Sequence, residues 1–98
     1  MEFEWDGRKD ASNFRKDGID FEFARRIFAG TVLERASDRR DYGEARIIAV
    51  GAVEGVEIVV VFTKRGETRR LISARRAHVS ERKAYREKFP ERGAPEPD

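Results

Sequence analysis

The sequence contains no cysteine and a single histidine among its 98 residues. The lack of cysteine excludes disulfides, thiolate metal sites and a cysteine nucleophile, and one histidine is too few for a conventional zinc centre. No stretch approaches the roughly 20 apolar residues of a membrane-spanning helix, and the acidic N-terminal residues lack the apolar segment of a signal peptide. We therefore expect a cytoplasmic protein that uses neither a metal ion nor a cofactor and that does not contact a membrane.

Glycine-rich motifs that bind nucleotides are missing as well. The sequence has no GxGxxG, P-loop or GxSxG pattern, and Gly51, Gly55 and Gly66 stand isolated at expected turns. These absences argue against the common nucleotide-cofactor enzymes and the serine hydrolases. A chain of this length also excludes a large multi-domain enzyme, so we expect one small domain over residues 1–89.

Charge is abundant, and it is unevenly distributed. Charged residues make up 41% of the chain, close to the polar limit for a globular protein. Residues 64–88 carry ten Lys or Arg against three Glu, whereas residues 1–63 have a small excess of acidic residues. Most of the basic residues are Arg, whose planar fork suits phosphates and carboxylates. The C-terminal third therefore predicts binding to a polyanion or to an acidic protein, with a plain solvated surface as the alternative.

The N-terminal half predicts one short strand and two helices. Alternation of Phe3 and Trp5 with acidic residues is typical of a short strand at a sheet edge. A helix over residues 7–17 follows, and a second helix runs from Asp20 to Gly30. The second helix has a predicted buried stripe of Phe21, Ala24, Ile27 and Phe28. We expect the following aromatic side chains to lie in the core rather than to stack on bases: Trp5, Phe14, Phe21 and Phe28.

The C-terminal half predicts a β-meander and a last helix. Residues 31–34 are typical of a short strand, and residues 37–43 are typical of a polar loop. Three further strands, most simply an antiparallel meander, are predicted over residues 45–53, 56–63 and 68–75. A basic helix begins near Ser80 and ends before Pro90, and residues 90–98 are expected to form a flexible, proline-rich tail. These elements define an α+β domain with its helices on one face of an antiparallel sheet.

Arginines are concentrated in the last predicted strand. Strict alternation sends Arg69 and Arg75 to one face of the sheet and Arg70 and Arg76 to the other. A sheet face with several guanidinium groups could hold an RNA backbone and stabilise the added negative charge of a pentavalent phosphorane.

Few residues qualify as a general acid or base. His78 is the only histidine, the side chain most often used for proton transfer near neutral pH. Glu44, Asp41 and Tyr42 beside the polar loop are further candidates, and Tyr85 could present its hydroxyl at the basic surface. Each of these residues has an ordinary alternative role, as a helix cap, a loop residue or a core aromatic.

Two runs of residues also occur in the order and spacing of a known family. The first run consists of Phe3-Glu4-Trp5-Asp6, Lys9, Asn13, Lys16, Gly18, Phe21, Ala24 and Phe28. The second run consists of Glu44, Arg46, Gly51, Val59-Val60-Val61-Phe62-Thr63, Arg65, Arg70-Leu71-Ile72-Ser73-Ala74-Arg75-Arg76-Ala77, Glu81-Arg82 and Tyr85. In both runs the sequence resembles the BrnT family of bacterial ribonuclease toxins.

This resemblance implies a RelE-like fold and the toxin of a type II toxin-antitoxin system, an RNase that is neutralised by an antitoxin of the BrnA type. It further implies a toxin homodimer within a toxin-antitoxin heterotetramer, which contacts DNA only through the antitoxin. RelE-like nucleases need no metal ion, because the 2′-hydroxyl of the RNA attacks the adjacent phosphate. The protein then supplies positioning, proton transfer and charge stabilisation.

The resemblance also suggests roles for individual residues. The residues expected to hold or stabilise the phosphate are Arg46, Arg65 and Arg75. Further RNA contacts are expected from Lys9, Lys16, Arg70, Arg76 and Arg82. The candidates for proton transfer are Glu44 as base, Tyr85 as donor and His78. Members of the family commonly have a histidine where this sequence has Asp17, so a catalytically weak or inactive binding module is the alternative function.

Overall fold

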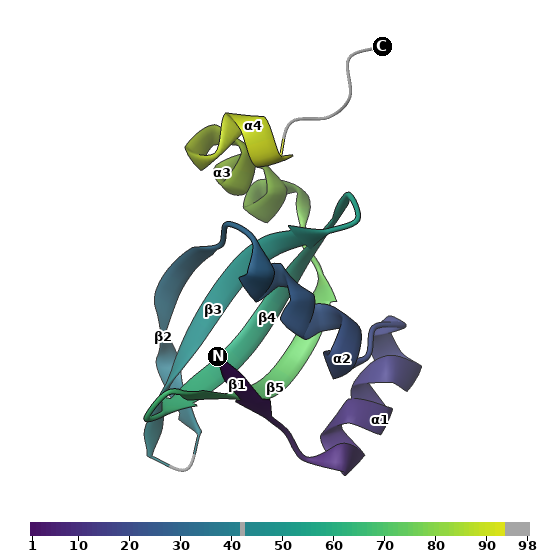
Figure 1. Cartoon of the computed structure of the whole chain (residues 1–98), viewed down its shortest axis with the longest axis vertical. Helices are drawn as coiled ribbons and strands as arrows, with labels where there is room; N and C mark the ends of the chain where they lie inside the picture. The colour runs from purple at the N-terminus through teal and green to yellow at the C-terminus, as the bar shows by residue number, and fades with distance from the viewer. Residues whose placement is uncertain (42, 94–98) are drawn as a thin grey trace.

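The computed structural model describes residues 1–41 and 43–93 as a mixed five-stranded sheet with helices on both sides (Figure 1). Its strands are β1 (Glu2–Glu4), β2 (Leu33–Asp41), β3 (Glu44–Val53), β4 (Val56–Arg65) and β5 (Thr68–Arg76). Its helices are α1 (Gly7–Asp17), α2 (Phe21–Ala24), the 3-10 helix η1 (Arg25–Ala29), α3 (Val79–Lys88) and α4 (Pro90–Gly93). The strand order is β1-β5-β4-β3-β2, with β1 parallel to β5 and the other pairs antiparallel. The α+β class, the meander and the N-terminal edge strand are therefore confirmed.

Helix α1 begins and ends where its capping residues predict. The Asp6 carboxylate accepts a hydrogen bond from the Arg8 amide at 2.8 Å, and Gly18 has a φ of +74°, the left-handed conformation that ends many helices. One prediction for this helix is wrong, because Phe14 is 55% exposed and the buried residue of α1 is Asn13. The reason is that α1 packs through a side-chain amide against the edge of β5, and not through an apolar stripe on a sheet face.

The second predicted helix is divided into α2 and η1, which cover one face of the sheet. Its predicted buried residues are confirmed as Phe21, Ala24, Ile27 and Phe28. A Cβ atom at Gly51 of β3 would lie 2.7 Å from the Ile27 Cβ, so only glycine lets η1 approach the strand this closely. The rings of Phe28 and Phe62 meet edge to face with their centroids 5.2 Å apart. These contacts join the helices to the centre of the sheet.

Strand β2 is longer than the sequence predicts. It extends from Leu33 to Asp41 and includes most of the segment expected to be a polar loop. Its register with β3 shifts between Ala36 and Arg40, and the turn-forming residues are accommodated at this irregularity. Pairing with the edge of β3 thus overrides the local preference for a loop. Tyr42, a predicted proton donor, lies outside the described residues, as does the side chain of Asp41.

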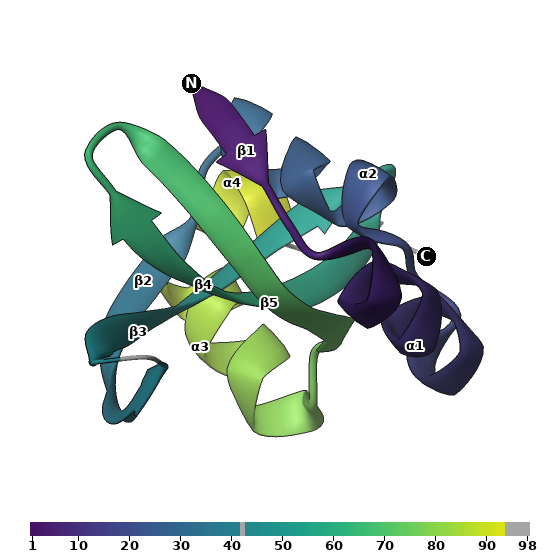
Figure 2. The ribbon, with the colours of Figure 1, turned by 90° about the horizontal axis from the view of Figure 1, so that it is seen from below.

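Helices cover both faces of the sheet, whereas we predicted one covered face. Helix α2 and η1 lie on one face and α3 lies on the other, as Figure 2 shows. On the α3 face, Tyr85 packs with Val50, Val59 and Ala77 in a second, smaller core. Helix α3 has ten residues, and it covers one end of this face while the other end carries polar side chains.

The chain continues beyond α3 into the short helix α4, at residues expected to belong to the tail. Proline at the first position of a helix is favourable, because its missing N–H needs no partner there. The rest of the predicted tail, residues 94–98, lies outside the described residues.

A β-bulge at Ile72 decides which arginines share a face. The register of β5 against β4 shifts by one residue at this position, so Leu71 and Ala74 are both buried on the α2 face. Strict alternation fails here, and our assignment of Arg70 and Arg75 to opposite faces is wrong. Both arginines lie on the α3 face.

Candidate functional site

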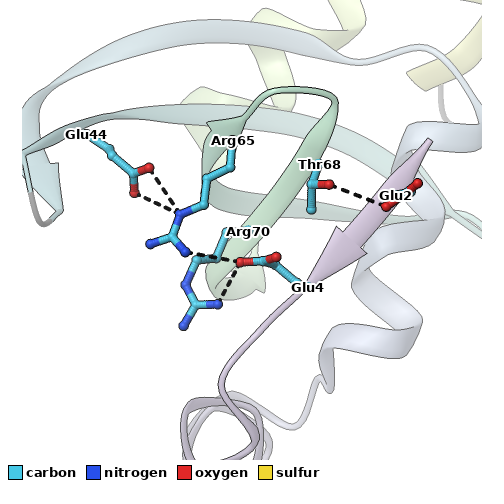
Figure 3. A network of polar contacts seen from close by, with 6 residues as sticks. All are labelled: Glu2, Glu4, Glu44, Arg65, Thr68 and Arg70. Atoms are coloured by element: carbon cyan, nitrogen blue, oxygen red, sulfur yellow. Dashed lines mark hydrogen bonds and ion pairs between the residues drawn. The ribbon is translucent and has the colours of Figure 1, made fainter.

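Four charged residues from four strands meet at the open end of the α3 face (Figure 3). We call Glu4, Glu44, Arg65 and Arg70, from β1, β3, β4 and β5 respectively, the sheet-face cluster. Arg65 Nε lies 3.1 Å from Glu44 Oε2, and Arg65 Nη1 lies 3.4 Å from Glu4 Oε2. Arg70 Nη1 donates to the same Glu4 oxygen at 2.9 Å. The predicted base Glu44 and the predicted phosphate ligand Arg65 are thus in direct contact.

The sheet-face cluster is ordered by its ion pairs but remains open to solvent. Its side chains are between 27% and 44% exposed. Ion pairs with this exposure contribute little to stability, and one partner can be exchanged for another. Arg46 lies two residues after Glu44 on β3 and therefore faces the same side of the sheet. A ligand that binds at this end of the sheet would have guanidinium groups close to its anionic groups and a carboxylate close to its hydroxyl groups.

A second cationic surface, the α1–β5 groove, lies between α1 and the open edge of β5. It has a volume of about 580 Å³, and its charged lining residues are Arg8, Lys9, Lys16, Asp17 and Arg75. The groove brings together three residues predicted to contact RNA, since Lys9 and Lys16 come from α1 and Arg75 comes from β5. Four cations against one carboxylate favour an anionic strand.

Asn13 fixes the spacing between the two walls of the groove. Its amide donates to the Ala74 carbonyl at 2.7 Å and its Oδ1 accepts from the Ala74 N–H at 3.0 Å, as a neighbouring strand would. The amide also donates to the Ile19 carbonyl at 2.8 Å. This edge is open to α1 because β1 pairs with β5 only as far as Arg70. Asn13 therefore takes the place of a strand partner for β5.

Arg75 is held at the rim of the groove by Glu81 of α3. Two parallel hydrogen bonds join the side chains, from Nη1 to Oε1 at 2.8 Å and from Nη2 to Oε2 at 2.7 Å. Glu81 also accepts from the His78 backbone N–H at 2.7 Å. The hydrogen bond from Arg75 lowers the pKa of Glu81 to about 2. In turn Glu81, with a smaller contribution from Asp17, raises the pKa of Arg75.

This pair makes the fold sensitive to acid. Folding lowers the pKa of Glu81 from 4.5 to about 2, so the pair stabilises the fold above pH 4.5 and loses this contribution as the pH falls towards 2. Glu81→Gln should therefore be less stable than the wild type at neutral pH, and the difference should shrink in acid. Urea unfolding at a series of pH values measures this difference in stability, and Glu87→Gln, a change at an exposed glutamate, is the control. A difference that is constant with pH would contradict the electrostatic origin.

The remaining predicted site residues lie elsewhere. Tyr85 is 1% exposed and its hydroxyl donates to the Thr31 carbonyl at 2.9 Å, so it is a core residue and not a donor at the site. His78 is exposed at the start of α3, and Arg82 of the same helix donates to a backbone carbonyl. Arg76 is exposed on the α2 face. None of these residues belongs to the sheet-face cluster or to the lining of the α1–β5 groove.

Three residues of the site were not expected from the sequence. Asn13 stands inside a helix, where asparagine is disfavoured, and this unusual placement could have indicated that its side chain has a structural role. Glu81 follows His78 by three residues, the spacing of a capping box. Glu4 gives no local signal, because its two arginine partners are 61 and 66 residues away in the sequence.

One known family covers most of the chain. A search among curated proteins gives no match. Within residues 1–41 and 43–93, no helix has the length and apolar character needed to cross a bilayer. The family described as "Ribonuclease toxin, BrnT, of type II toxin-antitoxin system" matches residues 5–81, which include α1, four of the five strands and Glu81. The chain therefore belongs to the BrnT family of ribonuclease toxins of type II toxin-antitoxin systems.

Proposed function

We propose that this protein is a metal-independent endoribonuclease whose catalytic centre is the sheet-face cluster. The observation that carries the proposal is the 3.1 Å contact between Glu44 and Arg65 on an open sheet face that also presents Arg70. A carboxylate base beside guanidinium groups is suited to cleavage by attack of the RNA 2′-hydroxyl. The nucleophile is then part of the substrate, so no metal-bound water is needed.

In the proposed reaction, Glu44 accepts the proton of the 2′-hydroxyl while the 2′-oxygen forms a bond to the adjacent phosphorus. Arg65 and Arg70, with Arg46 beside them, stabilise the added negative charge on the phosphorane oxygens. The bond from phosphorus to the 5′-oxygen breaks, and the leaving oxygen takes a proton from water. The products are a 2′,3′-cyclic phosphate and a 5′-hydroxyl end.

The α1–β5 groove is proposed to hold the RNA that flanks the cleaved bond. Arg75 at its rim shares the α3 face with the sheet-face cluster, and Lys9 and Lys16 line its other wall. Such contacts to phosphates do not depend on base identity and weaken with salt. Arg76 and Arg82 lie outside this path, and we do not include them in the proposed site.

The antitoxin is proposed to be of the BrnA type and to block this cationic surface. Glu4, Glu44 and Glu81 already pair with its arginines, so acidic side chains of a partner can compete with RNA for the same groups. In this proposal, toxin and antitoxin assemble in the cytoplasm as a heterotetramer around a toxin homodimer and reach DNA only through the antitoxin. The sheet with its flanking helices supports assignment to the RelE-like folds.

A second candidate function is a binding module without catalysis, acting through the antitoxin complex on its own operon. Asp17 favours it, because this residue stands at a position where the family commonly has histidine, and it lines the α1–β5 groove near Arg75. If a histidine at this position takes part in proton transfer, the present chain lacks that group.

RNA cleavage by the purified protein in a chelator tests the proposed function. We expect fragments that end in a 2′,3′-cyclic phosphate, and no cleavage of a substrate with 2′-deoxyribose in place of ribose. Arg65→Ala prepared in the same way excludes a contaminating nuclease. Intact RNA in the presence of folded protein would instead support the binding module.

Replacing Arg75 with alanine should weaken RNA binding about tenfold. It should also reduce the slope of the logarithm of the binding constant against the logarithm of the salt concentration by about one. Growth arrest by the toxin should be relieved accordingly. The change also leaves Glu81 unpaired, so circular dichroism must show that the variant is folded before its affinity is measured. Arg76→Ala, at the next residue on the opposite face, is the matched control. Equal affinities of wild type and Arg75→Ala would remove the groove from the RNA path.

A further inference from the structure

Strand β4 carries a fully buried hydroxyl group near its C-terminal end. Thr63 of β4 is 0% exposed, and its Oγ1 has no hydrogen-bond partner among the described residues. Buried hydroxyl groups are usually paired, because an unpaired one lowers stability. Valine has a similar shape and has no hydroxyl group to leave unpaired. The unpaired hydroxyl group therefore suggests a hydrogen-bond partner that is not part of the chain.

Thr63 lies beside the sheet-face cluster. Its cross-strand partner on β5 is Arg70, and Arg65 lies two residues further along β4 on the same face. Residues paired in this way have Cβ atoms about 4.5–5.5 Å apart, so the threonine hydroxyl and the Arg70 side chain are neighbours. The position is thus beside the contact between Glu44 and Arg65.

Arg70 supplies donors that complement the hydroxyl. Its Nη1 donates to Glu4 at 2.9 Å, whereas its Nε and Nη2 donate to no residue in the described part of the chain. The contact with Glu4 restrains the guanidinium group and leaves its other N–H groups available. The side chain is 27% exposed, so an anion can reach it from solvent.

We propose that Thr63 and Arg70 form a phosphate subsite, in which Thr63 Oγ1 and Arg70 Nε or Nη2 donate to the oxygens of one phosphodiester group. The inference rests on the proposed function and adds to it a hydroxyl donor beside the Glu44–Arg65 contact. Because Thr63 is fully buried, phosphate binding requires neighbouring side chains to move enough to uncover Oγ1. The exposed and exchangeable ion pairs of Arg65 and Arg70 permit such movement.

Thr63→Val and Thr63→Ser are the matched variants that test the subsite. Valine removes the hydroxyl and keeps the shape, so we expect about tenfold weaker binding of a short 2′-O-methyl oligonucleotide, with slower RNA cleavage and an equal or higher Tm. Serine keeps the hydroxyl and loses a buried methyl group, so we expect wild-type binding and cleavage with a lower Tm. Thr68→Val, which removes a hydroxyl 3.5 Å from Glu2, is the control with unchanged affinity.

The results separate the subsite from the proposed nuclease. If the wild type cleaves RNA and Thr63→Val binds and cleaves equally well, the subsite is wrong and the nuclease stands. If the wild type does not cleave RNA, the nuclease is wrong, while weaker oligonucleotide binding by Thr63→Val still supports the subsite. Loss of binding in Thr63→Ser, with Thr63→Val unaffected, would show that the methyl group matters and would overturn the role of the hydroxyl.

Discussion

Exchanging Glu44 for glutamine should lower the rate of RNA cleavage by roughly 10²- to 10⁴-fold, the usual contribution of a general base. Glutamine has the size of glutamate and can still accept a hydrogen bond from Arg65, but it cannot take the proton of the 2′-hydroxyl. Removal of a negative charge beside Arg65 should at the same time leave RNA affinity unchanged or raise it. The variant is therefore expected to bind normally and to cleave slowly.

Single-turnover cleavage and oligonucleotide binding, measured on the same preparation, test this separation of rate and affinity. Glu54→Gln is the matched control, because Glu54 is also a glutamate paired with an arginine, but it lies outside the sheet-face cluster. A parallel loss of rate and affinity in Glu44→Gln would show that Glu44 only positions Arg65. Full activity would remove Glu44 from the reaction and leave Glu4 as the carboxylate of the cluster to examine.

Replacing Asn13 with alanine should destabilise the fold by more than about 3 kcal/mol and lower the Tm by more than about 10 °C. The change removes three hydrogen bonds and leaves the Ala74 N–H and carbonyl at a buried strand edge without their partner. The helix backbone cannot replace the lost partner of the Ala74 N–H and carbonyl, because α1 contacts β5 through side chains and its own backbone groups are already paired within the helix. The loss should also loosen the wall of the groove that carries Lys9 and Lys16.

Urea unfolding of Asn13→Ala gives the change in stability, and Ser12→Ala is the control, since Ser12 is the exposed neighbour on the same helix. RNA affinity at a temperature where the variant is folded reports on the groove itself. An effect on stability no larger than that of Ser12→Ala would show that the edge of β5 is satisfied without Asn13.

Local signals along the chain were sufficient to predict the elements that depend on a few neighbouring residues. Helix α1 begins after Asp6 and ends at Gly18, because caps act on the adjacent turn of backbone. The β-prone runs of β3, β4 and β5 form strands in their predicted places. The sequence also identified Glu44 and Arg65 as candidates for chemistry. It could not place them 3.1 Å apart, because their contact depends on the register of β3 against β4.

Contacts between distant parts of the chain set which of these residues work together. The bulge at Ile72 puts Arg70 and Arg75 on one face, although the alternation of the sequence separates them. Asn13 meets Ala74 across 61 residues, and Glu4 meets Arg70 across 66 residues. Such pairings carry no local signature, since they follow from the packing of a helix on an open strand edge and from strand register. For this reason local sequence signals predicted most of the elements and the chemical groups, whereas the fold determined the site.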